Sequence, residues 1–115
     1  MAGYNNTSKD VALDAIGAAA TFISLHSADP GTTGANEISG GTYARVATTW
    51  SSAAASSKSG SQVTINVPAA ATITYWGVWS TITAGVFYEG GSLPASETYG
   101  GAGTYLLTPT LTATG

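Results

Sequence analysis

The sequence contains no cysteine and few charged residues, and each shortage excludes a class of protein. Without cysteine the chain can form neither a disulfide framework nor a thiolate metal site. Only three of its 115 residues are lysine or arginine and six are acidic, which gives a formal charge of −3. Three scattered cations cannot neutralise a row of phosphates, so we expect no binding to nucleic acid.

Large aliphatic residues and long apolar runs are also scarce. Valine, leucine, isoleucine and phenylalanine together supply 20 residues, whereas alanine, glycine, serine and threonine supply 66. The longest apolar stretch, Val11 to Leu25, is interrupted by Asp14 and is too short to span a bilayer, so we expect no membrane partner. Three tryptophans and six tyrosines nevertheless indicate a folded domain whose core relies on aromatic side chains.

The N-terminal segment has the pattern of one amphipathic helix. Apolar residues recur at three- and four-residue spacing and predict a helix over residues 8–20, preceded by an arm of residues 1–7. Asp10 is expected in the first turn, where a carboxylate complements the helix dipole. Asp10 and Asp14 are expected on the face opposite the apolar stripe. The stripe consists of Ala12, Leu13, Ile16, Ala19 and Ala20.

Beyond residue 20 the sequence predicts strands and turns up to residue 112. The expected strands are residues 21–26, 42–50, 63–67, 72–80, 86–88 and 104–112, with a serine- and alanine-rich connector at 51–60. The strand at 86–88 is expected to end at Gly90 and Gly91. Pro109 cannot donate to a ladder, which favours an edge position for the last strand. The pattern predicts one mainly β domain over residues 1–115, a small antiparallel β-sandwich or flattened barrel with one N-terminal α-helix.

Residues that could carry out catalysis are few. His26 is the only histidine, and Ser24, Ser27 and Asp29 lie too near it along one strand end to converge as a triad. A hydrogen bond to a loop carbonyl is therefore the expected role of His26. We predict no enzyme activity and no cofactor.

Two carboxylate-containing segments leave narrower alternatives. The loop from Asp29 to Glu37 could hold calcium through oxygen ligands, but turn formation at Asp29 explains the same residues. Glu89 and Glu97 could act as a glycosidase pair, but a solvated hairpin tip is the simpler interpretation. We expect no bound metal.

The middle of the chain has a surface suited to other subunits. Between Val46 and Tyr88, Lys58 is the only charged residue, whereas edge strands of soluble monomers are usually protected by charge. The aromatic residues Tyr75, Trp76, Trp79, Phe87 and Tyr88 could also stack on sugars, so a carbohydrate-binding module for host attachment is an alternative. The candidate interface residues are Tyr4, Leu13, Ile16, Trp50, Tyr75, Trp76, Trp79 and Tyr88.

Several stretches resemble a group of small tailed-phage virion proteins. They are Phe22-Ile23-Ser24-Leu25-His26-Ser27-Ala28-Asp29-Pro30-Gly31 with its continuation to Arg45, then Asn66-Val67-Pro68-Ala69, Trp76-Gly77-Val78-Trp79-Ser80 and Gly103-Thr104-Tyr105. The resemblance implies a tail-fibre-like or capsid decoration protein without catalytic residues.

Together with the charge-poor surface, this resemblance favours a capsid decoration protein bound to the outside of the shell. The alternative is a tail or tail-fibre component. The expected partners are the major capsid protein or other virion subunits, with formation of a homo-oligomer. The expected location is the exterior of the virion.

Overall fold

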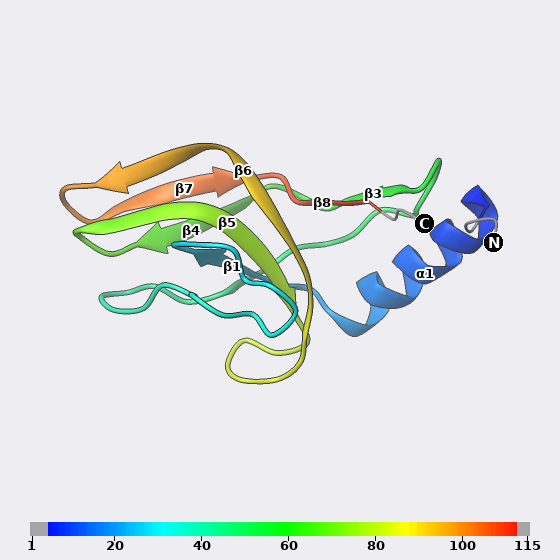
Figure 1. The fold of residues 1–115 in the computed structure, drawn as a ribbon, viewed down its shortest axis with the longest axis horizontal. Coiled ribbons are helices and arrows are strands. Elements are labelled where there is room, and N and C mark those ends of the chain that lie inside the picture. The colour runs from blue at the N-terminus through cyan, green and yellow to red at the C-terminus, as the bar shows by residue number, and fades with distance from the viewer. Residues whose placement is uncertain (1–4, 113–115) are drawn as a thin grey trace.

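The computed structural model describes residues 5–112, and within this range the chain forms one helix and eight strands (Figure 1). The molecule is elongated, with extents of 47 × 25 × 23 Å, and the helix lies at one end. The elements are α1 (Asn6–Ala19), β1 (Phe22–His26), β2 (Val46–Ala47), β3 (Ser57–Ser59), β4 (Val63–Val67), β5 (Ala71–Trp79), β6 (Phe87–Tyr99), β7 (Gly103–Leu107) and β8 (Thr110–Thr112).

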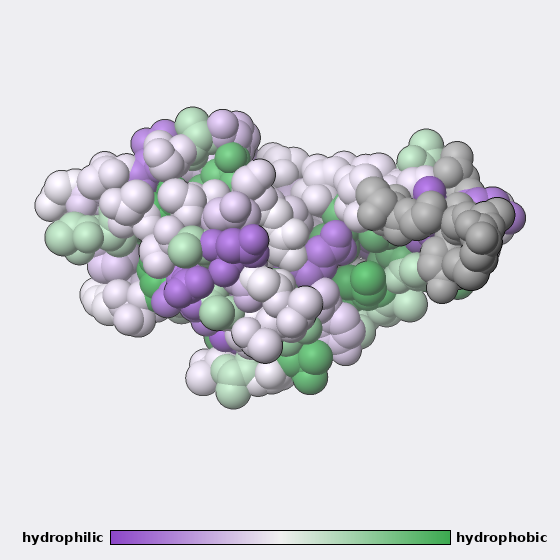
Figure 2. All heavy atoms as spheres, viewed as in Figure 1, coloured by the Kyte–Doolittle hydropathy of each residue, from purple (hydrophilic) through white to green (hydrophobic). Residues whose placement is uncertain are grey.

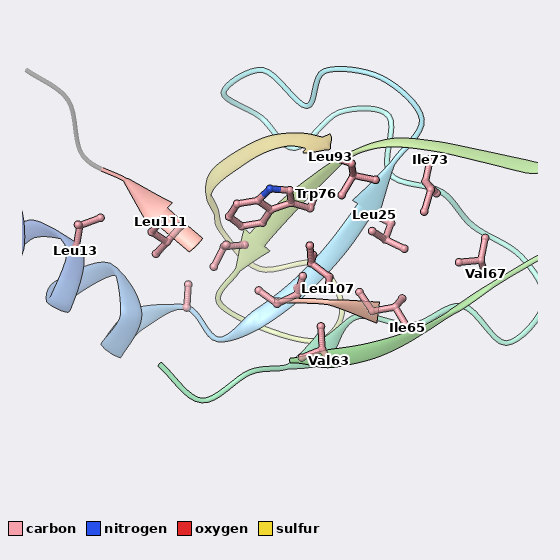
Figure 3. Close-up of a cluster of buried hydrophobic side chains, with 13 residues drawn as sticks. Leu13, Leu25, Val63, Ile65, Val67, Ile73, Trp76, Leu93, Leu107 and Leu111 are labelled. Carbon is pink, nitrogen blue, oxygen red and sulfur yellow. The ribbon is translucent and has the colours of Figure 1, made fainter. Parts of the chain in front are cut away.

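Two antiparallel layers enclose the hydrophobic core. One is a four-stranded sheet in the order β2-β1-β5-β6, and the other is the β4–β7 pair, with the β3–β8 pair adjoining it. One cluster of buried side chains runs from Leu13 and Leu111, past Trp76, to Ile73 and Val67 (Figure 3). The prediction of a mainly β fold with one helix is confirmed. The described strands form a sandwich, and they do not close into a barrel.

The segment predicted as one last strand is two strands. β7 pairs with β4 and β8 pairs with β3, and Pro109 lies buried between them. The carbonyl of Pro109 accepts a hydrogen bond of 2.9 Å from the N–H of Gly60. Proline has no N–H with which to continue the pairing, so it marks the interruption of the ladder. The predicted connector at 51–60 also contains a strand, β3.

β6 continues well past the glycines that the sequence predicts as its end. Gly90 and Gly91 pair with Gly77 and Trp76 of β5. A Cβ added to Gly90 would lie 2.6 Å from the carbonyl oxygen of Trp76, and one on Gly91 would lie 2.9 Å from its indole nitrogen. These glycines therefore allow β6 to pass close to a buried tryptophan, and they do not form a turn.

The helix begins at Asn6, two residues earlier than predicted. Asn5 caps it, since its side-chain oxygen accepts a 2.8 Å hydrogen bond from the N–H of Ser8. Asp10 consequently lies beyond the first turn, and the expectation that it complements the helix dipole there is wrong. Residues 1–4 of the predicted arm lie outside the described residues.

The acidic side of α1 packs on the rest of the chain, contrary to the prediction. Asp10 accepts a hydrogen bond from the N–H of Ser56, and Asp14 accepts from the N–H of Ala53 and from Nζ of Lys58. Of the predicted apolar stripe, Leu13 and Ala20 are buried and Ile16 is half-buried, whereas Ala12 and Ala19 are exposed. Carboxylates that satisfy backbone donors thus flank the buried leucine on the packed face.

Candidate functional site

A polar and aromatic cluster lies on the outer face of the four-stranded sheet, next to the loop of residues 27–45. β1 contributes Ser24 and His26, β5 contributes Trp79 and β6 contributes Phe87. Alternation along β1 directs its aliphatic side chains into the core and these two polar ones to the opposite face. Ser24 and His26 are nevertheless fully buried, because the loop covers them.

A continuous chain of hydrogen bonds connects these residues. The indole N–H of Trp79 donates to Ser24 Oγ over 2.9 Å, and Ser24 lies 2.7 Å from Nε2 of His26. Nδ1 of His26 donates to the carbonyl of Ala35 over 2.7 Å. A carbonyl only accepts, so Nδ1 carries the proton and Nε2 accepts from the serine hydroxyl. The expected bond from His26 to a loop carbonyl is confirmed.

Burial favours the same neutral state of the imidazole. It lowers the pKa of His26, because a buried ring is more costly to charge than a solvated one. The carbonyl of Ala35 and the carboxylate of Glu37 act in the opposite direction, and Arg45 reinforces the lowering. With a neutral His26 ring, each donor in this row of hydrogen bonds has an acceptor, so the cluster is complete without a ligand.

Arg45 joins two loops beside this cluster. Its guanidinium pairs with Glu37 through two hydrogen bonds of 2.8 and 2.9 Å and lies 3.7 Å from the ring centre of Trp79. The same side chain donates through Nη1 to the carbonyls of Thr81 and Ala84. A planar guanidinium can do all of this at once because its donors point in fixed, separate directions. Arg45 thereby holds the loop between β5 and β6 against the loop between β1 and β2.

Glu37 is fully engaged by its neighbours. The hydroxyl of Tyr43 donates to it over 2.7 Å and accepts from the N–H of Leu25 over 3.1 Å. Burial acts to raise the pKa of Glu37, but the hydrogen bonds from Arg45 and Tyr43 outweigh it and lower the pKa. Burial and the adjacent carboxylate raise the pKa of Tyr43, which therefore stays protonated. The carboxylate of Glu37 serves as a structural anion for two donors.

An open hollow of about 430 Å³ lies between these two loops. Glu37 and Arg45 line it and neutralise each other, and the remaining lining is uncharged. Ile38 and Ile82 contribute apolar side chains from opposite loops. The arrangement can therefore receive a neutral or apolar group.

The predicted interface residues differ greatly in exposure. Leu13, Trp76 and Trp79 are at most 8% exposed, and they fill the interior of this chain. Ile16, Trp50 and Tyr75 are half-buried. Tyr88 is 42% exposed, and Tyr4 lies outside the described residues. The chain itself thus uses most of the area that these side chains could offer a partner.

The burial of these aromatic side chains also limits how they could stack on a sugar. The aromatic residues considered for stacking are Tyr75, Trp76, Trp79, Phe87 and Tyr88, and Tyr88 is the one among them that is exposed. Both tryptophans lie inside the chain: Trp76 belongs to the core, and Trp79 contacts Arg45 and Phe87. A flat aromatic platform for a sugar ring is therefore not formed by these five side chains.

The remaining predicted site residues lie in a turn and in a strand. Asp29 accepts a hydrogen bond from the N–H of Gly31, as a turn requires. Glu89 and Glu97 both lie on β6, opposite Val78 and Ile73, so the expected hairpin tip is wrong. The pKa of Glu89 is raised by burial.

Neither a metal cluster nor a membrane span is found between residues 5 and 112. No group of three or more histidine, aspartate or glutamate side chains in this range is placed to hold a metal ion. No helix there is both long and apolar enough to cross a membrane.

Sequence reasoning missed the group formed by Arg45, Glu37 and Tyr43. These residues lie within nine positions of one another, on either side of the Gly40-Gly41 turn. In a chain with three cations, an arginine so near a glutamate and a tyrosine was an available signal for a buried ion pair. The carbonyls of Thr81 and Ala84, to which Arg45 also donates, could not be found in this way, because every residue has a backbone carbonyl.

The fold and this cluster define a small, two-layered β protein with one helix at its end and a sealed polar network on its outer sheet face. Residues 5–110 match a family model described as podophage GP4 fiber I protein gp80. The chain belongs to this family, and it is a fibre-associated structural protein of a bacteriophage virion. No curated protein matches the sequence.

Proposed function

We propose that the chain is a structural subunit of a fibre assembly on the exterior of a phage particle. The match over residues 5–110 to a family described as a fibre protein carries this proposal. The elongated body, 47 Å long, and its charge-poor composition support it, because uncharged surfaces pack together at low desolvation cost. The formal charge of −3 also suits the outside of the particle better than its DNA-filled interior.

The proposal assigns the chain no catalytic role. Ser24 and His26 are the pair closest to a nucleophile and its base, and both have no exposed surface. A substrate could reach them only if the loop of residues 27–45 opened. The hydrogen bond from His26 to the carbonyl of Ala35 instead fastens that loop to the sheet, and Ser24 accepts from Trp79 of the neighbouring strand.

Capsid decoration is the second candidate, and the outer face of α1 favours it. Val11 is 65% exposed there. The neighbouring alanines at 12, 15, 18 and 19 are exposed as well, so this face is apolar and nearly flat. A decoration protein acts in many copies, each of which buries a modest area against the shell.

Electron microscopy of intact particles distinguishes the two candidates. We expect gold-labelled antibody against the chain to mark the tail region, with a handful of copies per particle by quantitative mass spectrometry. Label over the whole shell, with hundreds of copies, would contradict the fibre assignment and support decoration. Purified particles that lack the chain would contradict both.

A further inference from the structure

We propose that residues 80–88, the contact loop, and the hollow beside them bind a second copy of this chain. The contact loop connects β5 to β6 and includes the first two residues of β6. This inference goes beyond the proposed function, because it names a partner and a surface that apply at either location in the particle.

The contact loop displays large apolar side chains to solvent. Ile82, Val86 and Tyr88 are 53%, 56% and 42% exposed. Figure 1 shows the loop projecting from the lower edge of the molecule, and Figure 2 shows strongly hydrophobic atoms in that region. Single exposed apolar residues are normal on a protein surface, but three within seven positions on a projecting loop indicate an interaction site.

Hydrogen bonds hold the contact loop in one conformation. Nη1 of Arg45 donates to the carbonyls of Thr81 and Ala84, over 3.0 and 2.7 Å. Ser80 closes the base of the loop, since its N–H donates to the carbonyl of Val86 and its Oγ accepts from the N–H of the same residue. A loop that is already ordered loses little conformational entropy when a partner binds.

The hollow and the projecting side chains are neighbours on the same surface. Ile82, Thr83 and Ala84 of the contact loop line the hollow of about 430 Å³ from one side. Ile38 and Tyr43 line it from the other loop. Two copies related by a two-fold axis can therefore each place Ile82 in the hollow of the other, and every contact is made twice.

The distribution of charge favours a second copy as the occupant. The contact loop contains no acidic or basic residue, and Glu37 and Arg45 neutralise each other in the hollow. Each copy has a formal charge of −3, so two copies repel least where they meet through uncharged surfaces. A strongly charged partner would find no complementary charge on this loop.

Sedimentation velocity at a series of protein concentrations tests the proposal. We expect the unmodified chain to self-associate and Ile82→Ser to raise the dissociation constant about 100-fold or more, because each dimer loses two buried side chains. Val11→Ser removes an exposed aliphatic side chain on α1 and should leave the dissociation constant unchanged. Circular dichroism and tryptophan fluorescence establish that both variants are folded, which exposed positions permit.

The absence of cysteine makes a disulfide cross-linking experiment straightforward. Chains that carry Ile82→Cys are mixed with chains that carry Ser39→Cys, a residue that lines the hollow, and the mixture is oxidised. We expect a covalent dimer of the two different chains. Leu106→Cys, exposed on β7, replaces Ile82→Cys in the control and should give little of this product.

Three results would overturn the inference. They are a chain that stays monomeric at all concentrations, equal weakening by Val11→Ser and Ile82→Ser, and equal cross-linking from positions 82 and 106. If a monomeric chain loses its place in the particle on Ile82→Ser alone, the contact loop binds a different virion subunit. Antibody labelling away from the tail would contradict the proposed function and leave this inference intact.

Discussion

Ser24 and His26 have the mutual geometry of a nucleophile and its base, yet their other contacts make them structural. Trp79 and the carbonyl of Ala35 occupy the remaining hydrogen-bonding positions. Gly77 provides the space, since a Cβ there would lie 2.8 Å from Ser24 Oγ and 2.9 Å from Nε2 of His26. The network thus depends on one uncharged imidazole packed against a position where no side chain fits.

This dependence predicts a loss of stability in mild acid. The pKa of His26 in the folded chain is below its usual 6.5 because of burial, whereas the unfolded chain binds the proton near 6.5. The unfolded state therefore takes up more protons as the pH falls, and the free energy of unfolding decreases below about pH 6.5. Urea unfolding followed by tryptophan fluorescence between pH 8 and pH 5 measures this decrease.

His26→Gln is the control for the pH prediction. Glutamine does not titrate, so the free energy of unfolding of this variant should change much less between pH 8 and pH 5. The variant retains Glu89, whose pKa is raised by burial and which stabilises the folded chain as the pH falls towards 4.5. Equal pH dependence in the two proteins would show that His26 is not responsible.

At the scale of single elements, the two-residue turn that leads into β3, between Ala54 and Ser57, is under backbone strain. Ala55 and Ser56 have φ values of 52° and 65°, in the left-handed region where a Cβ is unfavourable. The N–H of Ser56 donates to Asp10, so this turn also anchors α1. These φ values arise because both central positions of a tight two-residue hairpin turn require positive φ.

Ala55→Gly should therefore stabilise the chain. Glycine adopts positive φ without steric cost, and we expect a gain of about 0.5–1 kcal/mol in the free energy of unfolding. Ala54→Gly is the matched control, because Ala54 does not have positive φ and glycine there should destabilise by about 0.5–1 kcal/mol. Urea denaturation of the two variants gives the comparison, and a loss of stability in Ala55→Gly would contradict the assigned turn.

The elements differ in how well the sequence predicts them, for physical reasons. β4 alternates strictly between buried and exposed residues, and its bounds were predicted as found. For β6 the sequence predicts a strand that is too short, because the two glycines that accommodate Trp76 resemble a turn. The split at Pro109 was missed, because alternation continues through Leu107, Pro109 and Leu111 although the pairing partner changes.

The candidate site was predictable only in its local part. The bond from His26 to a nearby loop carbonyl follows from a polar residue at a strand end beside a turn. The contact between Arg45 and the carbonyls at 81 and 84 joins segments 36 and 39 residues apart, which no local pattern encodes. The hollow lies between the two loops that this contact joins, so no local pattern in the sequence predicts it.

At the scale of the whole molecule, the helix end and the sandwich share a single core. Leu13 of α1 and Leu111 of β8 belong to the same buried cluster as Ile65 and Ile73, at the other end of the strands (Figure 3). Trp50 adds a link, since its indole N–H donates to the carbonyl of Ala20 where α1 meets β1. Continuous packing of this kind indicates that the elongated chain unfolds as one unit.

Leu13→Ala tests this continuity. The substitution leaves a cavity at the helix end and should lower the free energy of unfolding by about 2–5 kcal/mol. Far-ultraviolet circular dichroism reports on α1 and the strands, whereas tryptophan fluorescence reports mainly on the sandwich. We expect their transitions to shift together to lower urea concentration, because loss of the helix contact destabilises the shared core. Val11→Ala, at an exposed position on α1, should change the free energy of unfolding by no more than about 0.5 kcal/mol with either probe. Early loss of helical signal, with fluorescence still native, would instead show that α1 unfolds on its own.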